Sequence, residues 1–346
     1  MKPQYLSICL LVLLFLGTGG RSFAQYSFTT IDDPSANDGT VVTGISGNTI
    51  AGYYFASNGA NSSEYGFLYD GSNYTTLEDP LGIAGSTEVD GISGTNVVGY
   101  YISSSDNLQH GFLYSGGTYT TIDDPLALGG HNYAQGISGN NIAGYYSGSS
   151  GGVSGFLYNG NSFTTLTVPG AAGTTPLGIS GNNVVGFYGD TDDLVQHGFL
   201  YNGSTYLTLD DPLASPEGVP YSGTIATGIS GNNIVGDYYE PNTISHGFLF
   251  NGSTYTTIDV PLSTETTILG IDGNNIVGSY YSDGMLHGFE ATLTPEPSTV
   301  ALLGLGLCTL AWATRCRFPS GHPELVEGSA SGKSALNRTE CLPSGS

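Results

Sequence analysis

A segment of 42 to 50 residues occurs six times in this sequence, and this repeat constrains the fold more than any other feature. In its clearest copy, residues 228–261, it reads GISGNNIVGDYY, then a short insert, then HGFLFNGSTYTTIDVP. The first element of the repeat begins at six glycines: Gly44, Gly91, Gly136, Gly178, Gly228 and Gly270. A period of this length predicts a modular all-β array.

Each repeat contains four short runs rich in Val, Ile, Thr, Tyr and Phe, a composition typical of strands. In the second copy these runs cover 86–93, 96–101, 110–114 and 118–123. Ser-Gly-Asn or Ser-Gly-Thr separates the first two runs, and Asn-Gly or Asp-Gly separates the last two in most copies. Because such pairs favour tight hairpin turns, the pattern predicts an up-and-down antiparallel sheet of four strands in each repeat.

Consecutive apolar residues in the predicted strands, such as Ile234-Val235, point to opposite faces of a sheet because side chains alternate along a strand. Both faces must then be covered, as they are in radially packed propeller blades. The sixth copy, 270–293, lacks a fourth strand, and an equivalent strand, 26–34, precedes the first copy. We therefore predict an all-β, six-bladed β-propeller over 25–293, closed by its N-terminal strand, which removes open sheet edges.

Charge is distributed very unevenly. Residues 25–293 contain no Lys or Arg and hold 25 of the 29 acidic residues. Nucleic acid is therefore excluded as a partner, because phosphate contacts require cations. The four cysteines all lie outside the array, so its stability depends on apolar burial and strand hydrogen bonds rather than on disulfides.

The two ends of the chain carry apolar segments. Residues 1–24 are typical of a secretory signal peptide, with Lys2, an apolar core over 6–16 and a cleavage site between Ala24 and Gln25. An N-terminal membrane anchor is the alternative, but the apolar run is short for a span.

Residues 294–317 form a Pro-rich hinge, an apolar stretch over 299–314 and a basic end, which together predict a transmembrane helix whose Arg end is cytoplasmic. Residues 318–346 are predicted to be a disordered tail. The residues that define the apolar segment's flanks are Pro295, Glu296, Pro297, Arg315 and Arg317.

This C-terminal order resembles the PEP-CTERM sorting signal of Gram-negative bacteria. The resemblance implies transient insertion in the inner membrane, processing by an exosortase and release to the cell surface or an exopolysaccharide matrix. The repeats in turn resemble extracellular repeats of the HAF type, as shown by Gly91-Ile92-Ser93, Val97-Val98-Gly99 and 110–113 (HGFL). That second resemblance implies a surface protein and no particular activity.

One repeat position holds a histidine in four copies, which raises the question of a metal site. These rings belong to strands about two strand spacings, roughly 10 Å, outside the innermost strands, so they are too far apart to share an ion. We expect each ring to be packed at a blade edge with one hydrogen bond. The four histidines are His110, His197, His246 and His287.

Paired carboxylates precede proline at the end of the fourth strand, as in Asp32-Asp33-Pro34 and Asp123-Asp124-Pro125. Asp-Pro is a turn signal, and turn formation is the favoured interpretation. Weak Ca²⁺ binding and catalysis are the alternatives. No cofactor and no dedicated metal site is predicted.

The connections that vary between copies lie together at one end of the predicted ring, where recognition usually resides. We expect a ligand, a glycan or a cation, to bind there. The candidate contacts in these loops are Asp190, Asp192, Asp193, His131 and Tyr133.

The sequence is compatible with two functions. The first is an exported, non-enzymatic structural or recognition module of the cell surface or extracellular matrix, with extracellular polysaccharide as a candidate partner. The alternative is a polysaccharide hydrolase or lyase that uses loop carboxylates. An enzyme should gather two or more non-repeated carboxylates in one place, whereas a purely structural module should show only repeated ones.

Overall fold

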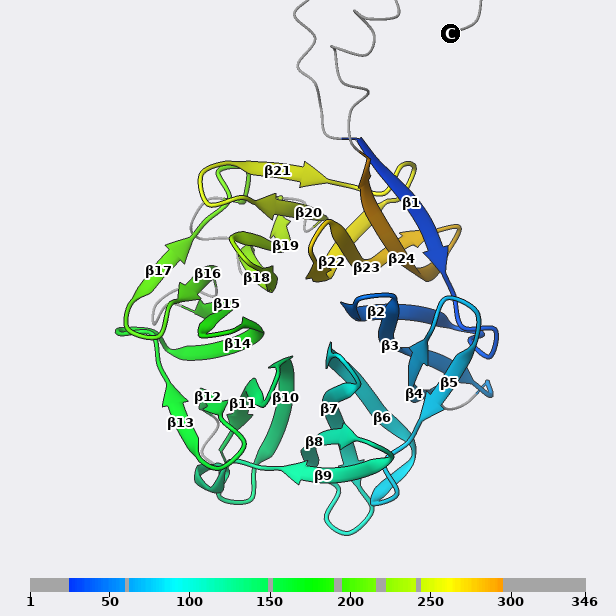
Figure 1. Ribbon diagram of the computed structural model, residues 1–346, viewed down its shortest axis with the longest axis vertical. Coiled ribbons are helices and arrows are strands. Elements are labelled where there is room, and N and C mark those ends of the chain that lie inside the picture. The colour runs from blue at the N-terminus through cyan, green and yellow to red at the C-terminus, as the bar shows by residue number, and fades with distance from the viewer. Residues whose placement is uncertain are drawn as a thin grey trace, which may run out of the picture. The chain divides into compact units, whose positions relative to one another are not determined.

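The computed structural model describes residues 25–59, 62–148, 152–189, 195–215, 222–240 and 244–294. Within these ranges the chain forms four-stranded antiparallel sheets arranged as six blades around a central axis (Figure 1). The predicted signal peptide, transmembrane segment and tail lie outside the described residues, as do Asp190, Asp192 and Asp193. In the part of the chain that is described, no helix has the length and hydrophobicity needed to cross a membrane.

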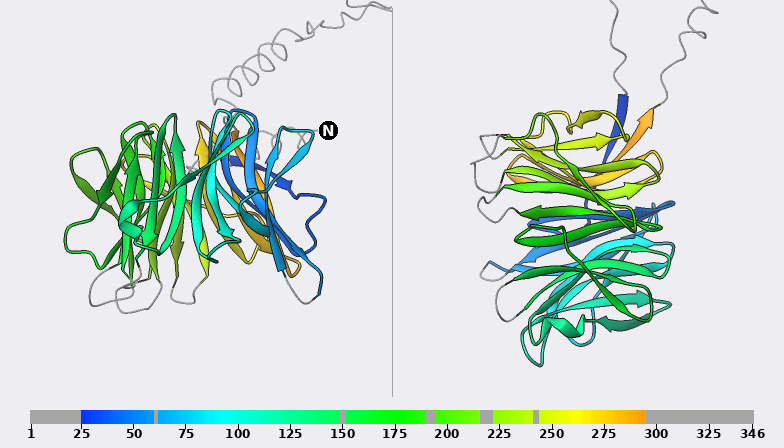
Figure 2. Two further views of the ribbon diagram at one scale, coloured as in Figure 1. Left: turned by 90° about the horizontal axis from the view of Figure 1, so that it is seen from below. Right: turned by 90° about the vertical axis from the view of Figure 1, so that its left-hand side faces the viewer.

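The strands of each blade follow one another from the axis outwards, except in blade 6, where the first strand of the chain is outermost (Figures 1 and 2). Blade 1 is β2 (Gly39–Ser46), β3 (Thr49–Ser57), β4 (Ser62–Tyr69) and β5 (Tyr74–Leu77); blade 2 is β6 (Gly82–Ser93), β7 (Asn96–Ser103), β8 (Gln109–Ser115) and β9 (Thr118–Ile122); blade 3 is β10 (His131–Ser138), β11 (Asn141–Ser147), β12 (Val153–Tyr158) and β13 (Phe163–Leu166); blade 4 is β14 (Gly173–Ser180), β15 (Asn183–Gly189), β16 (Gln196–Tyr201) and β17 (Tyr206–Leu209); blade 5 is β18 (Gly223–Ser230), β19 (Asn233–Tyr239), β20 (Ser245–Phe250) and β21 (Tyr255–Ile258); blade 6 is β22 (Glu265–Asp272), β23 (Asn275–Ser282), β24 (Met285–Thr294) and β1 (Gln25–Ile31).

The N-terminal strand closes the ring as predicted. β1 pairs antiparallel with β24, in a register that runs from Gln25 opposite Thr294 to Ile31 opposite Gly288. Beyond the strand, Asp32 accepts a hydrogen bond from His287 at 2.8 Å. The last blade is therefore assembled from the two ends of the array.

The six repeat glycines fix the inner ring. Each follows a β-bulge in the innermost strand, where it approaches the same glycine of the next blade. A Cβ added at Gly178 would lie 2.6 Å from the carbonyl oxygen of Thr227 and 3.0 Å from the Cα of Gly228. Only glycine allows this separation, which explains why the GIS element recurs.

Hydrogen bonds link the blades at the hairpins between first and second strands. In most described blades a serine Oγ accepts the backbone N–H of the next blade's turn glycine, for example Ser46 from Gly94 at 2.9 Å. At the closure, Asp272 takes the serine's place and accepts from Gly47 at 2.7 Å. We call this end of the propeller the turn end and the opposite end the loop end.

The core lies between blades. Phe67, in the third strand of blade 1, is fully buried and packs in a cluster with Val42 of its own blade and Val277 of blade 6. The equivalent phenylalanines of the other five blades are also fully buried. Both sheet faces are thus covered, as the sequence pattern predicted.

One predicted loop is shorter than expected. His131 and Tyr133 were predicted to lie in one of the variable loops, but β10 begins at His131. Asp124 caps the short 3₁₀ helix η1 (Pro125–Ala127), and its backbone N–H donates to Asn132 Oδ1 at 2.9 Å. This contact draws the chain into the sheet early, so both residues lie on a strand.

Candidate functional site

The repeated histidines pair with aspartates that directly follow the outermost strands. The Nδ1–Oδ distances are 2.6 Å for His110–Asp123, 3.0 Å for His197–Asp210 and 2.9 Å for His246–Asp259. Each ring also stacks on a tyrosine of its own blade. The two blades without the histidine, which have Tyr65 and Ser154 instead, also lack the aspartate. This pairing within blades agrees with a packing role.

The second carboxylate of each Asp-Pro pair forms a turn. Asp33, Asp79, Asp124 and Asp211 each accept, through Oδ1, the backbone N–H two residues later at 2.8 to 2.9 Å. These contacts are the side-chain turns that Asp favours before proline. The repeated carboxylates therefore serve the backbone, in agreement with the favoured interpretation.

A different group of side chains breaks the repeat. Six residues of blades 1 to 3 come together towards the loop end of the propeller, and we name them the tyrosine–carboxylate site. All six are half-buried. They are Tyr53 of β3, Glu64 of β4, Glu88 of β6, Tyr100 of β7, Tyr133 of β10 and Tyr145 of β11.

Strand register brings these residues together. Glu88 lies directly opposite Tyr100, and Tyr133 directly opposite Tyr145. Across the blade boundary, the rings of Tyr100 and Tyr133 meet edge to face at 5.0 Å between centroids, while Tyr133 stacks on Tyr145 at 4.6 Å. The Tyr100 hydroxyl donates a hydrogen bond to Glu88.

The carboxylates of the site oppose one another's ionisation. Burial first, and then the nearby Glu64 carboxyl, raise the pKa of Glu88 to about 7, although the hydrogen bond from Tyr100 acts in the opposite direction. Burial also raises the pKa of Glu64. Burial, together with the neighbouring carboxylates, raises the pKa of Tyr53 well above its usual range. Perturbed groups gathered in this way are typical of functional sites.

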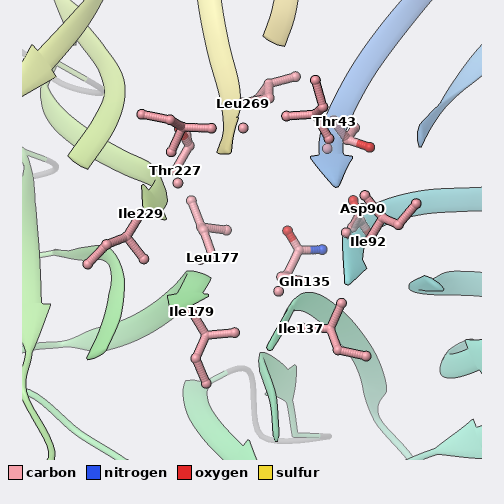
Figure 3. A pocket seen from close by; sticks show the side chains of 18 residues that line it. Thr43, Asp90, Ile92, Gln135, Ile137, Leu177, Ile179, Thr227, Ile229 and Leu269 are labelled. Atoms are coloured by element: carbon pink, nitrogen blue, oxygen red, sulfur yellow. The ribbon is translucent and has the colours of Figure 1, made fainter. Parts of the chain in front are cut away.

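Asp90 lies beside this site, in the bulge of β6, and borders a cavity of about 70 Å³ on the propeller axis (Figure 3). Its Oδ2 is buried and has no hydrogen-bond partner among the described residues. Burial, and then Glu88 and Glu64, raise the pKa of Asp90 well above its usual range. Thr43, Gln135 and Thr227 of other blades line the same cavity.

A second hollow lies at the turn end, between blades 1 and 2. It has a volume of about 350 Å³ and is lined by residues that include Leu68, Asp70, Ile92 and Tyr114. Most of its lining comes from repeated strand positions and hairpins. Its one carboxylate, Asp70, accepts the backbone N–H groups of Asn73 and Ser72, which lower its pKa and hold the hairpin turn. Because this carboxylate serves the turn, we do not choose the hollow as the principal site.

The predicted contacts have different outcomes. Tyr133 belongs to the tyrosine–carboxylate site. His131 is adjacent to it: its Nδ1 accepts the backbone N–H of Gln109 at 3.1 Å, and its ring is 6.5 Å from Tyr133. Asp190 and its neighbours lie outside the described residues, so their role stays a prediction. Within the described ranges, no three His, Cys, Asp or Glu side chains are grouped as metal ligands.

Glu64, Glu88 and Asp90 were not singled out from the sequence. A signal was present, because equivalent positions in the other repeats are mostly neutral. Glu88 stands where the other blades have Val41, Tyr133, Thr175, Ile225 and Thr267. The bulge shifts register by one residue, however, so the spatial grouping could be seen only in the structure.

Comparison with known proteins identifies the C-terminal segment. Residues 293–317 match the family described as the PEP-CTERM protein-sorting motif. This motif implies an exported protein that is sorted by an exosortase and membrane-anchored before processing. No curated protein matches the chain.

Several solved structures are similar to the propeller at low identity. A fungal lectin from Aleuria aurantia, described as a six-bladed β-propeller with a novel fucose recognition mode, is 19% identical over 65% of this chain and 79% of its own, with a TM-score of 0.44. A Trypanosoma rangeli sialidase is 8% identical over 84% of this chain and 61% of its own, with a TM-score of 0.47. The β-propeller domain of a Pyrococcus furiosus protease is 7% identical over 75% and 99%, with a TM-score of 0.45.

Proposed function

We propose that this chain is an exported, non-enzymatic saccharide-recognition module and that its ligand binds at the tyrosine–carboxylate site. The sorting motif implies export, and an extracellular polysaccharide is the class of partner that an exported module of this kind would meet. The resemblance of the repeats to the HAF type fits the same location.

One observation carries the proposal: Glu64, Glu88 and four tyrosines lie together in blades 1 to 3. Blades 4 to 6 have neither glutamate nor tyrosine at the equivalent positions. Aromatic rings offer large flat surfaces to the apolar faces of sugar rings. A few convergent polar groups then fix orientation, as is usual in ligand sites. A structural ring alone would not require these departures from the repeat.

The placement of the site agrees with this role. Glu64 lies near the start of β4, after the β3–β4 connection, and Tyr133 near the start of β10, after the connection from β9, while Glu88 lies near the middle of β6. The connections that vary most between copies therefore surround the site. The chain continues into the sorting motif from Thr294, which pairs with Gln25 at the turn end.

Charge limits the ligand. With no Lys or Arg between residues 25 and 293, the site has no cation to neutralise uronate, sulfate or phosphate groups. Acidic polysaccharides would meet uncompensated repulsion from Glu64, Glu88 and Asp90. The ligand should therefore be neutral or basic.

Hydrolysis of a glycoside is the second candidate, because a carboxyl with a pKa of about 7, as at Glu88, suits a general acid. However, Glu64 and Glu88 interact directly with each other. Glycosidases of the two-carboxylate type hold the carboxyls about 5 to 9.5 Å apart, which leaves room for the sugar or water. The observed arrangement therefore favours binding over turnover.

The proposal is tested on the propeller alone, residues 25–294, which lies within a compact unit whose strand pairings are internal. A panel of neutral and basic oligosaccharides is screened for binding, and Tyr133→Ala is compared with the matched control Tyr281→Ala. Tyr281 is 42% exposed, in blade 6, away from the site. We expect Tyr133→Ala to weaken binding at least tenfold and Tyr281→Ala to leave it unchanged. Absence of binding to the whole panel, or equal effects of the two variants, would contradict the proposal.

A further inference from the structure

We propose that the saccharide is cationic: an amino sugar with a free, protonated amine, which Glu88 and Asp90 bind between the tyrosine rings and the axial cavity. This inference rests on the proposed recognition function and names its ligand class.

No cation of the protein compensates the carboxylates of the site. Glu64, Glu88 and Asp90 affect one another electrostatically, and Lys and Arg are absent from residues 25–293. His131 lies beside the site, against Tyr133, and its Nδ1 accepts a backbone N–H from Gln109. The other groups facing the carboxylates are the hydroxyls of Tyr53 and Tyr100. A positive charge must therefore come from the ligand.

Asp90 has a buried oxygen that needs a hydrogen-bond donor, which independently favours a cationic ligand. Its buried Oδ2 has no partner among the described residues, and a buried acceptor without a hydrogen bond is costly. An ammonium group has three donors and no acceptor, so it can satisfy Asp90 and still bind neighbouring oxygens. The cavity of about 70 Å³ has room for such a group, because about 10 to 15 Å³ of volume measured in this way is enough to hold a water molecule.

Other groups around the cavity are suitable for an ammonium. Thr43 and Gln135 of blades 1 and 3 line the axial cavity on either side of Asp90, and Thr227 of blade 5 lies across from it, as Figure 3 shows, whereas leucines occupy the equivalent positions of blades 4 and 6. The polar neighbours of Asp90 in the ring are thus Thr43 and Gln135. The Thr43 hydroxyl donates to the backbone carbonyl of Val89, so it and Gln135 can offer acceptor oxygens to an ammonium beside Asp90.

The tyrosines of the site also attract a cationic ligand. An aromatic ring attracts a cation to its face, and several rings together recognise ammonium ligands. Tyr100, Tyr133 and Tyr145 form a continuous edge-to-face and stacked group next to Glu88. Because Glu88 and Asp90 accept hydrogen bonds, a primary ammonium fits better than a quaternary one, which has no N–H to donate.

Proton release should accompany binding. An arriving ammonium favours the charged form of the neighbouring carboxyls, so protons held by Glu88 and Asp90 leave. Binding should then tighten as pH rises from 5 towards 7. It should weaken again when the amine of the ligand loses its own proton.

The experiment is isothermal titration of the propeller at pH 6.5 with three tetrasaccharides of the same β-1,4 linkage: glucosamine, N-acetylglucosamine and glucose. The expected result is that the glucosamine tetramer binds at least tenfold tighter than the other two and releases protons to the buffer. Glu88→Gln and Asp90→Asn should each reduce its affinity at least tenfold. Glu265→Gln, which changes an exposed carboxylate of blade 6, is the matched control and should have no effect.

The outcomes separate the two proposals. If the glucose or N-acetylglucosamine tetramer binds as tightly as the glucosamine tetramer, and Tyr133→Ala still abolishes binding, the cationic ligand is wrong and saccharide recognition stands. If no saccharide binds, both proposals fail. If choline displaces the glucosamine tetramer at equal concentration, the primary amine is the wrong assignment. Melting curves of each variant confirm that the affinity loss is not unfolding, and Glu88→Gln serves if Asp90→Asn fails to fold.

Discussion

Tyr100 donates a hydrogen bond from its hydroxyl to Glu88, the residue directly opposite it in the pairing of β7 with β6. The same two positions hold Tyr145 and Tyr133 in blade 3, and Tyr53 and Val41 in blade 1. A pair of strand positions that occurs in all six blades thus carries tyrosine or glutamate side chains in the neighbouring blades 1 to 3, and these side chains form the site together with Glu64. The site is built from strands, which hold side chains more rigidly than loops do.

The first prediction concerns stability and pH. Burial raises the pKa of Glu88 from 4.5 to about 7 and raises that of Asp90 and of Asp237 well above their usual range. Between pH 4.5 and 7 the folded state therefore binds more protons than the unfolded state, so the free energy of unfolding falls as pH rises. For Glu88 alone the fall amounts to at most about 3 kcal/mol.

Denaturant unfolding at pH 5 and pH 8 measures this effect. The wild type should be less stable at pH 8, and Glu88→Gln should reduce the difference between the two pH values. Glu265→Gln is the control and should leave the difference as it is in the wild type. A wild-type protein that is more stable at pH 8 than at pH 5 would show that these carboxyls ionise normally in the folded state.

The second prediction concerns the Tyr100–Glu88 hydrogen bond. This bond stabilises the charged form of Glu88 and lowers its pKa against the opposing effect of burial. Tyr100→Phe should therefore raise the pKa of Glu88 above about 7, which a carboxyl-labelled NMR titration can follow. Tyr188→Phe, which removes a hydroxyl that bonds to Thr208 in blade 4, should not change it. An unchanged pKa in Tyr100→Phe would mean that the hydroxyl does not bond to Glu88.

The third prediction concerns the inner glycine ring. Gly178→Ala places a methyl group 2.6 Å from the carbonyl oxygen of Thr227, so adjacent blades must move apart. We expect a loss of about 1 to 3 kcal/mol in the free energy of unfolding. Gly152→Ala is the matched control, because nothing lies within 4 Å of its added Cβ and its backbone is not in the left-handed region. Equal stability of the two variants would refute the packing argument.

The fourth prediction concerns closure. Deleting residues 26–34 removes the partner of β24 and the Asp32–His287 hydrogen bond, so blade 6 is left with an exposed edge. The truncated protein should melt at a clearly lower temperature and associate through the free edge. Thermal melting and light scattering measure both effects. If the truncated chain melted at the same temperature as the intact propeller and stayed monomeric, the N-terminal strand would not be needed for closure.

Much of the fold could be predicted from the sequence, because each repeat carries its own turns and strands. The missing fourth strand at 270–293 and the extra strand at 26–34 were enough to predict the closure. The start of β10 was misjudged, because the contact between Asn132 and Asp124 is a side-chain interaction that propensities do not encode.

The site was harder to predict than the fold. Glu64 and Glu88 are 24 residues apart in different blades, and they meet only because β4 and β6 run side by side where Glu64 pairs with Ser86. The bulge at Asp90 then turns that carboxylate to the axis. Tyr133 was selected for its place near a variable loop, whereas its importance lies in its contacts with Tyr100 and Tyr145.

The most direct test of the account is a crystal structure of the propeller with the glucosamine tetramer. We predict a sugar ring against Tyr133, with its amine within hydrogen-bond distance of Glu88 or Asp90. A tetramer bound instead in the hollow lined by Asp70 and Tyr114, or at the outer histidine–aspartate pairs, would contradict the assignment of the tyrosine–carboxylate site.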